Sequence, residues 1–290
     1  MTANVLVNGI IAGGIYALLA SGFSLVFGVA KIMNMAHTAF YMICAFILFM
    51  LGVQLRLPLI VSAVSAVLLT GVIAMVCYRL FFDRVKEHVT AVMLISIALA
   101  LLFQEVFLLA FSGSYHHVPP FVAGFAEIAG IRVSYQHIIA VCASVVALVA
   151  VWLLLSRTRL GKAIRAVAED REIANLMGIN VSLISMITMG MSVVLAGIAA
   201  VIVAPIYMVH PLMWTHPLII MLAAVVLGGL GSLKGAVVGA YMLGFAETAV
   251  VALIPDGSFL RGAISLSVMV VVLMFRPEGL FGVVFEEERL

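Results

Sequence analysis

Three polar side chains recur at helical spacing in an apolar stretch near the start of the chain. Asn34, His37 and Tyr41 follow one another at intervals of three and four residues within KIMNMAHTAFYM. On an α-helix this spacing puts all three on one face. Polar side chains among apolar ones usually face a bundle interior or a water-filled path. Either this face lines a route for a polar solute, or Asn34 caps a helix while His37 forms one interhelical hydrogen bond.

Two carboxylates have only apolar or uncharged neighbours on both sides. They are Glu105 in LLFQEVFLLA and Glu247 in GAYMLGFAETAVV. An isolated ionised carboxylate in such a setting is costly, so each must be partnered, protonated or hydrated. A proton relay would need further Asp, Glu or His residues along the same helix, and neither carboxylate has an obvious series of them. The pattern therefore favours a hydrogen-bonded structural role over a relay.

Catalytic and metal-binding motifs are missing from the sequence. HExxH, GxSxG and carboxylate clusters do not occur, and the adjacent His116 and His117 have no third ligand nearby. Cys44, Cys77 and Cys142 lie within apolar runs and form no CxxC motif, so they are predicted to pack as small hydrophobic side chains. The sequence predicts no enzyme, no bound cofactor and no metal site.

A glycine-rich segment, VLGGLGSLKGAVVG, lies near residue 230. It contains Gly228, Gly229, Gly231 and Ser232 just before Lys234, but the phosphate-binding pattern GxxxxGK[ST] is absent. Glycines at this density permit a tight turn, close helix packing or a hinge. The segment is predicted either to turn and pack closely or to lend flexibility to the wall of a solute path.

One charged, helix-forming segment interrupts the apolar sequence, LGKAIRAVAEDREIANLMGINV at residues 160–181. Its charged residues at the centre are Lys162, Arg165, Glu169, Asp170, Arg171 and Glu172. Each charge in hydrocarbon would cost about 2.5–3.5 kcal/mol, so this segment must lie in water at the membrane face. Arg165 and Glu169 are one turn apart and able to pair, and Gly178 is placed to end the helix. The loop 156–180 is either a solvated connection or a contact for a soluble partner.

The composition defines an integral membrane protein. The chain has 290 residues, of which 66% are hydrophobic and 10% charged, whereas soluble domains carry about 25% charged residues. The apolar runs mix small residues with Leu, Ile and Val, and they lack the alternation of an outer-membrane barrel. The predicted fold is an all-α polytopic bundle forming a single domain, residues 1–290. Net charge is only +2 and the basic residues are dispersed, so nucleic acid is not expected as a partner.

Nine apolar segments are candidates for transmembrane helices, each near the length of about 20 residues that a crossing needs. They lie at 8–30, 33–53, 57–78, 89–111, 137–155, 181–203, 217–233, 236–254 and 262–275. Because several are short or interrupted by glycine, the predicted range is eight to ten. The first thirty residues lack the basic start of a cleavable signal peptide, so the first segment is expected to remain as a helix.

The distribution of basic residues predicts the orientation. With nine crossings and the N-terminus outside, 12 of the 15 Lys and Arg residues fall on the cytoplasmic side. This places the loop 156–180 and the acidic C-terminal end, with Glu286, Glu287 and Glu288, in the cytoplasm. The loop 112–136 becomes the longest outer loop, and its Pro119-Pro120 pair argues against one continuous helix. The first four and last four segments would then have opposite topology, as in an inverted repeat.

Four motifs, in order, resemble the inner-membrane permeases of branched-chain amino acid ATP-binding-cassette importers. They are LVNGIIAGGIYALLASGFSLVFGVAKIMNMAHTAFYM, AIRAVAEDREIANLMGINV, VVLGGLGSLKGAVVGAYMLGFAE and RPEGLFG. They extend from about residue 6 to residue 282, nearly the whole chain, and the chain is most similar to the shorter of the two permease subunits. The resemblance implies a bacterial inner-membrane location, a second related permease, two cytoplasmic ATPases and an extracytoplasmic substrate-binding protein.

The resemblance also gives the charged segment a role, as the coupling helix that docks on an ATPase. Its implied central positions are Glu169, Asp170, Ala174 and Gly178, with contacts from Arg165 and Arg171.

One segment departs from the family pattern. Where the family commonly has NFAHGEFYM, this chain has NMAHTAFYM, so Met35, Thr38 and Ala39 replace an aromatic residue, a glycine and a carboxylate. The predicted cargo is a small amino acid, with branched-chain ones favoured. The alternatives are urea, short amides or small organic acids carried by the same kind of permease, or an ion-coupled secondary transporter that uses Glu105 or Glu247.

Overall fold

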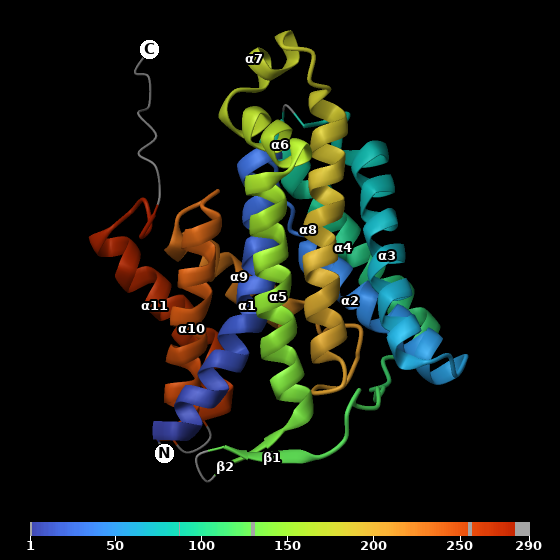
Figure 1. Cartoon of the computed structure of the whole chain (residues 1–290), viewed down its shortest axis with the longest axis vertical. Coiled ribbons are helices and arrows are strands. Elements are labelled where there is room, and N and C mark those ends of the chain that lie inside the picture. Colours follow the sequence, from blue (N-terminus) through green and yellow to red (C-terminus); the bar gives the residue numbers. More distant parts are fainter. Residues whose placement is uncertain (1, 87, 129–130, 255–256, 282–290) are drawn as a thin grey trace.

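A computed structural model describes residues 2–86, 88–128, 131–254 and 257–281. The acidic end with Glu286, Glu287 and Glu288 lies outside the described residues. Helices dominate the described chain because its apolar runs are long enough to satisfy every backbone hydrogen bond internally, as a bilayer demands. Figure 1 shows the bundle, with its longest helices running roughly along its long axis.

Seven helices of the described chain are long and apolar enough to cross a membrane. Their bounds are α1 Thr2–Ala30, α2 His37–Phe49 with its π-helical extension Met50–Gln54, α3 Leu59–Cys77 with its π-helical extension Tyr78–Phe82, α4 Val89–Phe111, α5 Tyr135–Arg157, α8 Val181–Val203 and α10 Leu233–Leu253. Two shorter apolar helices, α9 Thr215–Gly228 and α11 Arg261–Phe275, complete the set of apolar helices. Each of the nine predicted segments overlaps one of these helices.

Helix α1 occupies the middle of the bundle. It packs against α10, α8, α5 and α9, and Leu18, Leu19 and Phe23 on it are buried. The outward faces of α3, α4 and α5 instead expose large apolar side chains such as Leu68, Leu94 and Val146. Such faces suit hydrocarbon rather than water, so the bundle is a polytopic membrane protein.

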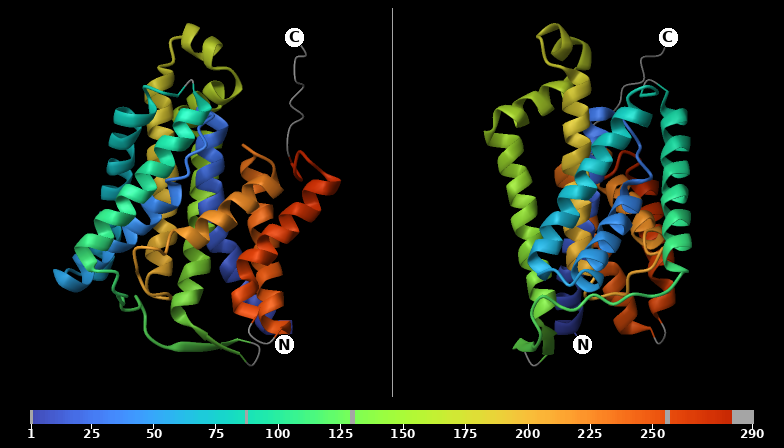
Figure 2. Two further views of the ribbon diagram at one scale, coloured as in Figure 1. Left: turned by 180° about the vertical axis from the view of Figure 1, so that it is seen from behind. Right: turned by 90° about the vertical axis from the view of Figure 1, so that its right-hand side faces the viewer.

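The charged segment and the long loop lie at opposite ends of the bundle. Two short helices, α6 Arg159–Glu169 and α7 Arg171–Leu176, project at one end (Figures 1 and 2). The start of α1 lies at the other end, beside the loop 112–136.

The loop 112–136 contains a feature that the sequence prediction missed. A two-stranded antiparallel sheet joins β1 Phe125–Ile128 to β2 Ile131–Ser134, with Phe125 opposite Ser134 and Ala126 opposite Val133. The described fold is therefore mostly helical rather than wholly α. Strands of four residues are too short for their alternation to stand out, and only the pairing between them stabilises the extended backbone.

Candidate functional site

The charged segment forms two helices instead of one because Asp170 ends the first and begins the second. The Asp170 backbone is extended (φ −149°, ψ 118°), and its side chain accepts hydrogen bonds from the backbone N–H groups of Glu172 at 2.8 Å and Ile173 at 2.9 Å. This is an N-cap, which satisfies donors that the first turn of α7 would otherwise leave free. Gly178, with φ of 82°, follows α7 in the left-handed conformation that glycine adopts without strain.

The charged segment is anchored to α1 from below. Ile164, Val167 and Ala174 are buried in one small core with Leu25 and Val29 of α1. This apolar contact fixes the position of both short helices on the end of the bundle.

Arg171 adds a polar link to the same helix. Its Nε and Nη2 donate to the backbone carbonyl of Val29, at 3.3 and 3.1 Å. Val29 lies in the last turn of α1, where carbonyl groups lack helical partners and a cation is favoured. Burial lowers the pKa of the Arg171 guanidinium below its ordinary value, but arginine remains a cation at neutral pH.

Three large apolar side chains are exposed on α7 and its C-cap, beside the exposed polar residues Glu172 and Asn175. Ile173, Leu176 and Met177 are 59%, 85% and 77% exposed, and we call these three residues the apolar tip. Spacings of three and four residues put 173, 176 and 177 on one face of a helix. The spacing of these three residues is visible in the sequence, but the sequence prediction singled out the charged residues around them instead.

Besides Asp170 and Gly178, which cap and end α7, the residues that the resemblance assigned to coupling divide into two groups. Arg165 and Glu169 are exposed, and the described ion pairs do not include one between them. Ala174 is buried and Arg171 is bonded to α1, so these two face the bundle.

The polar trio near the start of α2 is buried. Asn34 precedes α2, and its Oδ1 accepts from the Ala36 N–H at 3.1 Å. His37 Nδ1 lies 3.2 Å from Ser192 Oγ on α8, a single interhelical hydrogen bond. The His37 contact matches the predicted interhelical hydrogen bond, whereas Asn34 stabilises the turn before α2 and does not cap it, because Ala36 is the N-cap and no side chain caps the helix. Tyr41, by contrast, lines a cavity.

The glycine-rich segment forms the turn between α9 and α10. A side chain at Gly228 would collide with the backbone of Gly235, which shows how closely the two helices meet there. Gly229 and Gly231 lie in the turn with positive φ, and Ser232 caps α10 by accepting from the Gly235 N–H at 3.1 Å. These contacts favour a tight turn with close helix packing over a flexible part of the wall of a solute path.

The two isolated carboxylates have different surroundings. Glu105 is exposed on α4 and accepts a hydrogen bond from the neighbouring Gln104 at 3.3 Å. Glu247 is only 3% exposed, and it accepts from Tyr16 Oη at 2.8 Å and from Ser265 Oγ. Glu247 on α10 thus links α1 and α11 through hydrogen bonds. This agrees with the predicted hydrogen-bonded structural role rather than with a proton relay.

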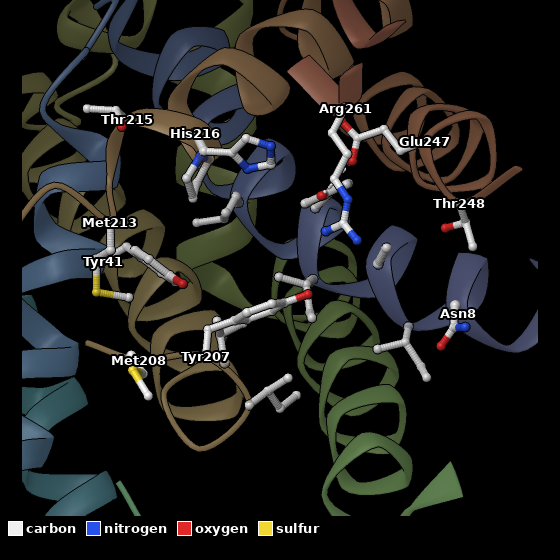
Figure 3. Close-up of a pocket in the computed structure, with 18 of the residues that line it drawn as sticks. Asn8, Tyr41, Tyr207, Met208, Met213, Thr215, His216, Glu247, Thr248 and Arg261 are labelled. Carbon is white, nitrogen blue, oxygen red and sulfur yellow. Dashed lines mark hydrogen bonds between the residues drawn. The ribbon is translucent and has the colours of Figure 1, made fainter. Parts of the chain in front are cut away.

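Glu247 and Tyr41 both line a cavity of about 490 Å³. The cavity lies toward the end of the bundle where α1 begins, away from α6 and α7. Its walls come from α1, α10, α11 and the segment 203–217, with Tyr41 of α2 and His137 of α5. In Figure 3 the Arg261 guanidinium and the Tyr207 hydroxyl point toward one another across it, with His216 close by. Asn34, His37 and the residues 228–232 do not line it.

The non-helical segment 204–214 forms one wall of this cavity. Helix α9, which follows it, has 14 residues and rises about 21 Å, less than the hydrocarbon thickness of about 30 Å. Irregular backbone at membrane depth is tolerated only where it is buried in protein or lines a water-filled space. Backbone hydrogen bonds of 2.8 and 2.9 Å between Val209 and His116 of the loop 112–136 hold the segment in place.

Comparison with known proteins connects this architecture to transport. The family model described as "Branched-chain amino acid transport system / permease component" matches residues 5–275. The chain belongs to this permease family. The charged segment, the glycine-rich turn and the cavity all fall within the matched region.

Curated relatives agree over nearly the full length. The branched-chain amino acid transport system permease protein BraD of Pseudomonas aeruginosa is 30% identical, over 96% of this chain and 94% of its own length. LivH of Escherichia coli K12 is 27% identical, over 95% of this chain and 94% of its own. A probable LivH of Methanocaldococcus jannaschii is 26% identical, over 96% and 92%.

The fold also resembles a solved structure, PsaBC from Streptococcus pneumoniae in complex with Fab. The TM-score is 0.52 with 15% sequence identity, covering 94% of this chain and 92% of that chain. At this identity the likeness concerns the fold alone.

Proposed function

We propose that this chain is a permease subunit of an ATP-binding-cassette importer that carries small amino acids, with branched-chain ones as the favoured cargo. Family membership supports the class. The apolar tip is the observation that carries the mechanism. It projects from one end of the bundle on a segment that is anchored to α1. Exposed apolar side chains on an anchored helix suit a groove on a soluble protein.

The proposal gives α1 the central part in coupling. Its 29 residues form one continuous helix, with Val29 bonded to Arg171 at one end and Asn8 to Leu19 lining the cavity at the other. A force on α7 would therefore reach the cavity through a single rigid element of about 43 Å. ATP-driven closure of the two ATPase subunits would supply that force.

The topology proposed for this role has nine spans, an outer N-terminus and a cytoplasmic C-terminus in the bacterial inner membrane. The excess of Lys and Arg on the side of α6 and α7 supports this orientation. An inverted relation between the first four and last four spans remains part of the proposal. A second related permease, two cytoplasmic ATPases and an extracytoplasmic binding protein would complete the importer.

Substitution at the apolar tip tests the docking role. In the complete importer, Leu176→Glu would place a charge in the apolar contact. We expect ATPase binding to weaken by at least about tenfold, the effect of losing one strong interface residue. ATP-dependent leucine uptake into proteoliposomes should fall with it. Val122→Glu, on an exposed apolar residue of the loop 112–136, is the matched control and should leave both unchanged.

Two results would refute the proposal. One is that the Leu176→Glu importer binds the ATPase subunits and takes up leucine as well as the wild-type importer does. The other is accumulation of solute by the chain alone in vesicles that hold an ion gradient and no ATP, the behaviour of a secondary transporter.

A further inference from the structure

The cavity described above presents one cation and one anion from different helices. Arg261 begins α11, and its guanidinium points into the cavity (Figure 3). Glu247 on α10 faces the same space. The ion pairs among the described residues are Lys86–Asp83 and Arg132–Glu127, so Arg261 and Glu247 do not neutralise each other by direct contact.

Glu247 has hydrogen-bonding capacity left. Two hydroxyl donors, Tyr16 and Ser265, each use one of its oxygens. An ionised carboxylate offers about four lone-pair sites, so an ammonium group has acceptors available beside these donors. Because both donors are neutral hydroxyls, they orient the carboxylate without cancelling its charge.

The opposite side of the cavity suits a carboxylate ligand. Guanidinium groups bind carboxylates through two parallel hydrogen bonds. The Tyr207 hydroxyl, which faces Arg261 in Figure 3, adds a donor. Tyr207 lies in the irregular segment 204–214, which forms one wall of the cavity.

The remaining lining mixes polar side chains, namely Asn8, His137, His210, Thr215, His216 and Thr248, with apolar ones. The apolar side chains, among them Ile11, Ile15, Leu19, Val203, Met213 and Val251, provide a surface for an aliphatic group. The volume of about 490 Å³ falls within the range of about 300–1,000 Å³ for small-molecule sites. A zwitterion with an aliphatic side chain matches all three walls, and its two charges balance those of the protein. Urea or a simple amide carries no charge and would leave both protein charges without an ionic partner in a partly buried space, which is costly.

We infer that this cavity is a binding site for a zwitterionic aliphatic amino acid, held by Arg261 at its carboxylate and by Glu247 at its ammonium group. The inference rests on the proposed transport function and deepens it. It assigns part of the cargo selection to this permease chain, in addition to the extracytoplasmic binding protein. The site lies in the half of the bundle away from α6 and α7, and α1 forms part of its wall.

Ligand-induced shifts of thermal unfolding test the site. The full chain in lipid nanodiscs is heated with leucine, with leucinamide, which lacks the carboxylate, and with 4-methylpentanoate, which lacks the ammonium group. Leucine should raise the unfolding midpoint, whereas each analogue should need about tenfold more ligand or more for the same shift. Equal shifts with all three compounds, or none with leucine, would overturn the assignment.

Arginine variants locate the site. Arg261→Gln should weaken leucine binding by about tenfold or more, and Arg261→Lys should lose less because it retains the charge without the planar fork. Arg132→Gln is the matched control, since Arg132 lies on β2 with 82% of its side chain exposed. Unchanged leucine binding in Arg261→Gln that unfolds at the wild-type temperature would refute the site.

Transport separates this inference from the proposed function. In the complete importer, Arg261→Gln should raise the leucine concentration for half-maximal uptake while ATPase subunits remain bound. If wild-type importer carries leucine with ATP but Arg261→Gln shows the same concentration dependence, the cavity assignment fails and the importer function stands. If the wild-type importer carries no amino acid, the proposed function fails.

Discussion

Arg171 combines two properties that its sequence neighbourhood does not reveal. It lies among exposed charges, yet its guanidinium bonds to the Val29 carbonyl at the end of α1. Charged hydrogen bonds of this kind contribute about 1.5–3 kcal/mol each. At this residue the surface helix and the transmembrane bundle meet, so its loss should affect transmission of motion more than docking.

Arg171→Ala in the complete importer should separate docking from transport. Because the apolar tip is intact, we expect ATPase binding to change by less than about threefold, whereas uptake per ATP hydrolysed should fall about tenfold, as loss of a charged hydrogen bond permits. Arg159→Ala, at an exposed arginine of the same segment, should behave as wild type. Tight coupling in Arg171→Ala would show that the bond to α1 does not carry the motion.

At the scale of elements, the break between α6 and α7 depends on one side chain. Helix α7 has only six residues, too few to be stable alone. Its conformation therefore relies on the Asp170 cap and on burial of Ala174 in the small core formed with α1, α6 and α8. The apolar tip is presented correctly only while this turn of helix persists.

Asp170→Ala should loosen α7. Loss of an N-cap costs about 1 kcal/mol, which corresponds to about fivefold faster exchange of the Ile173 and Ala174 backbone amide hydrogens. Asp170→Ser, which restores a capping oxygen, should exchange close to the wild-type rate. If exchange in Asp170→Ala stays at the wild-type rate, packing alone would hold α7 and the cap would be dispensable.

At the scale of the whole molecule, the proposed function assigns separate tasks to the two ends of the bundle. One end has α6 and α7, and the other has the loop 112–136 and the region of the cavity. Helix α1 runs between them and packs against α10, α8, α5, α9 and α6. This arrangement requires the two ends to lie on opposite sides of the membrane.

Cysteine labelling checks that requirement. In a Cys142→Ser background, where the remaining Cys44 and Cys77 are buried, a membrane-impermeant maleimide should label Arg132→Cys in spheroplasts. Glu169→Cys should react only after the membrane is permeabilised, because positive-inside sorting places it in the cytoplasm. The reverse pattern, or equal labelling of both, would contradict the proposed orientation.

The sequence by itself determined the membrane class, the positions of nine apolar segments and the one segment that must lie in water. These follow from local properties, namely hydropathy over about 20 residues and the cost of charge in hydrocarbon. Gly178 was likewise predictable, because ending a helix in the left-handed conformation is a local preference of glycine.

Only the tertiary structure decided which side chains face inward. Arg171 and Ala174 turn toward α1, Glu247 meets Tyr16 from 231 residues away, and the strands β1 and β2 exist because they pair. The cavity joins Asn8 to Arg261 from opposite ends of the sequence. Contacts between helices remote in sequence depend on how their faces pack together, and no spacing along a single helix records that choice.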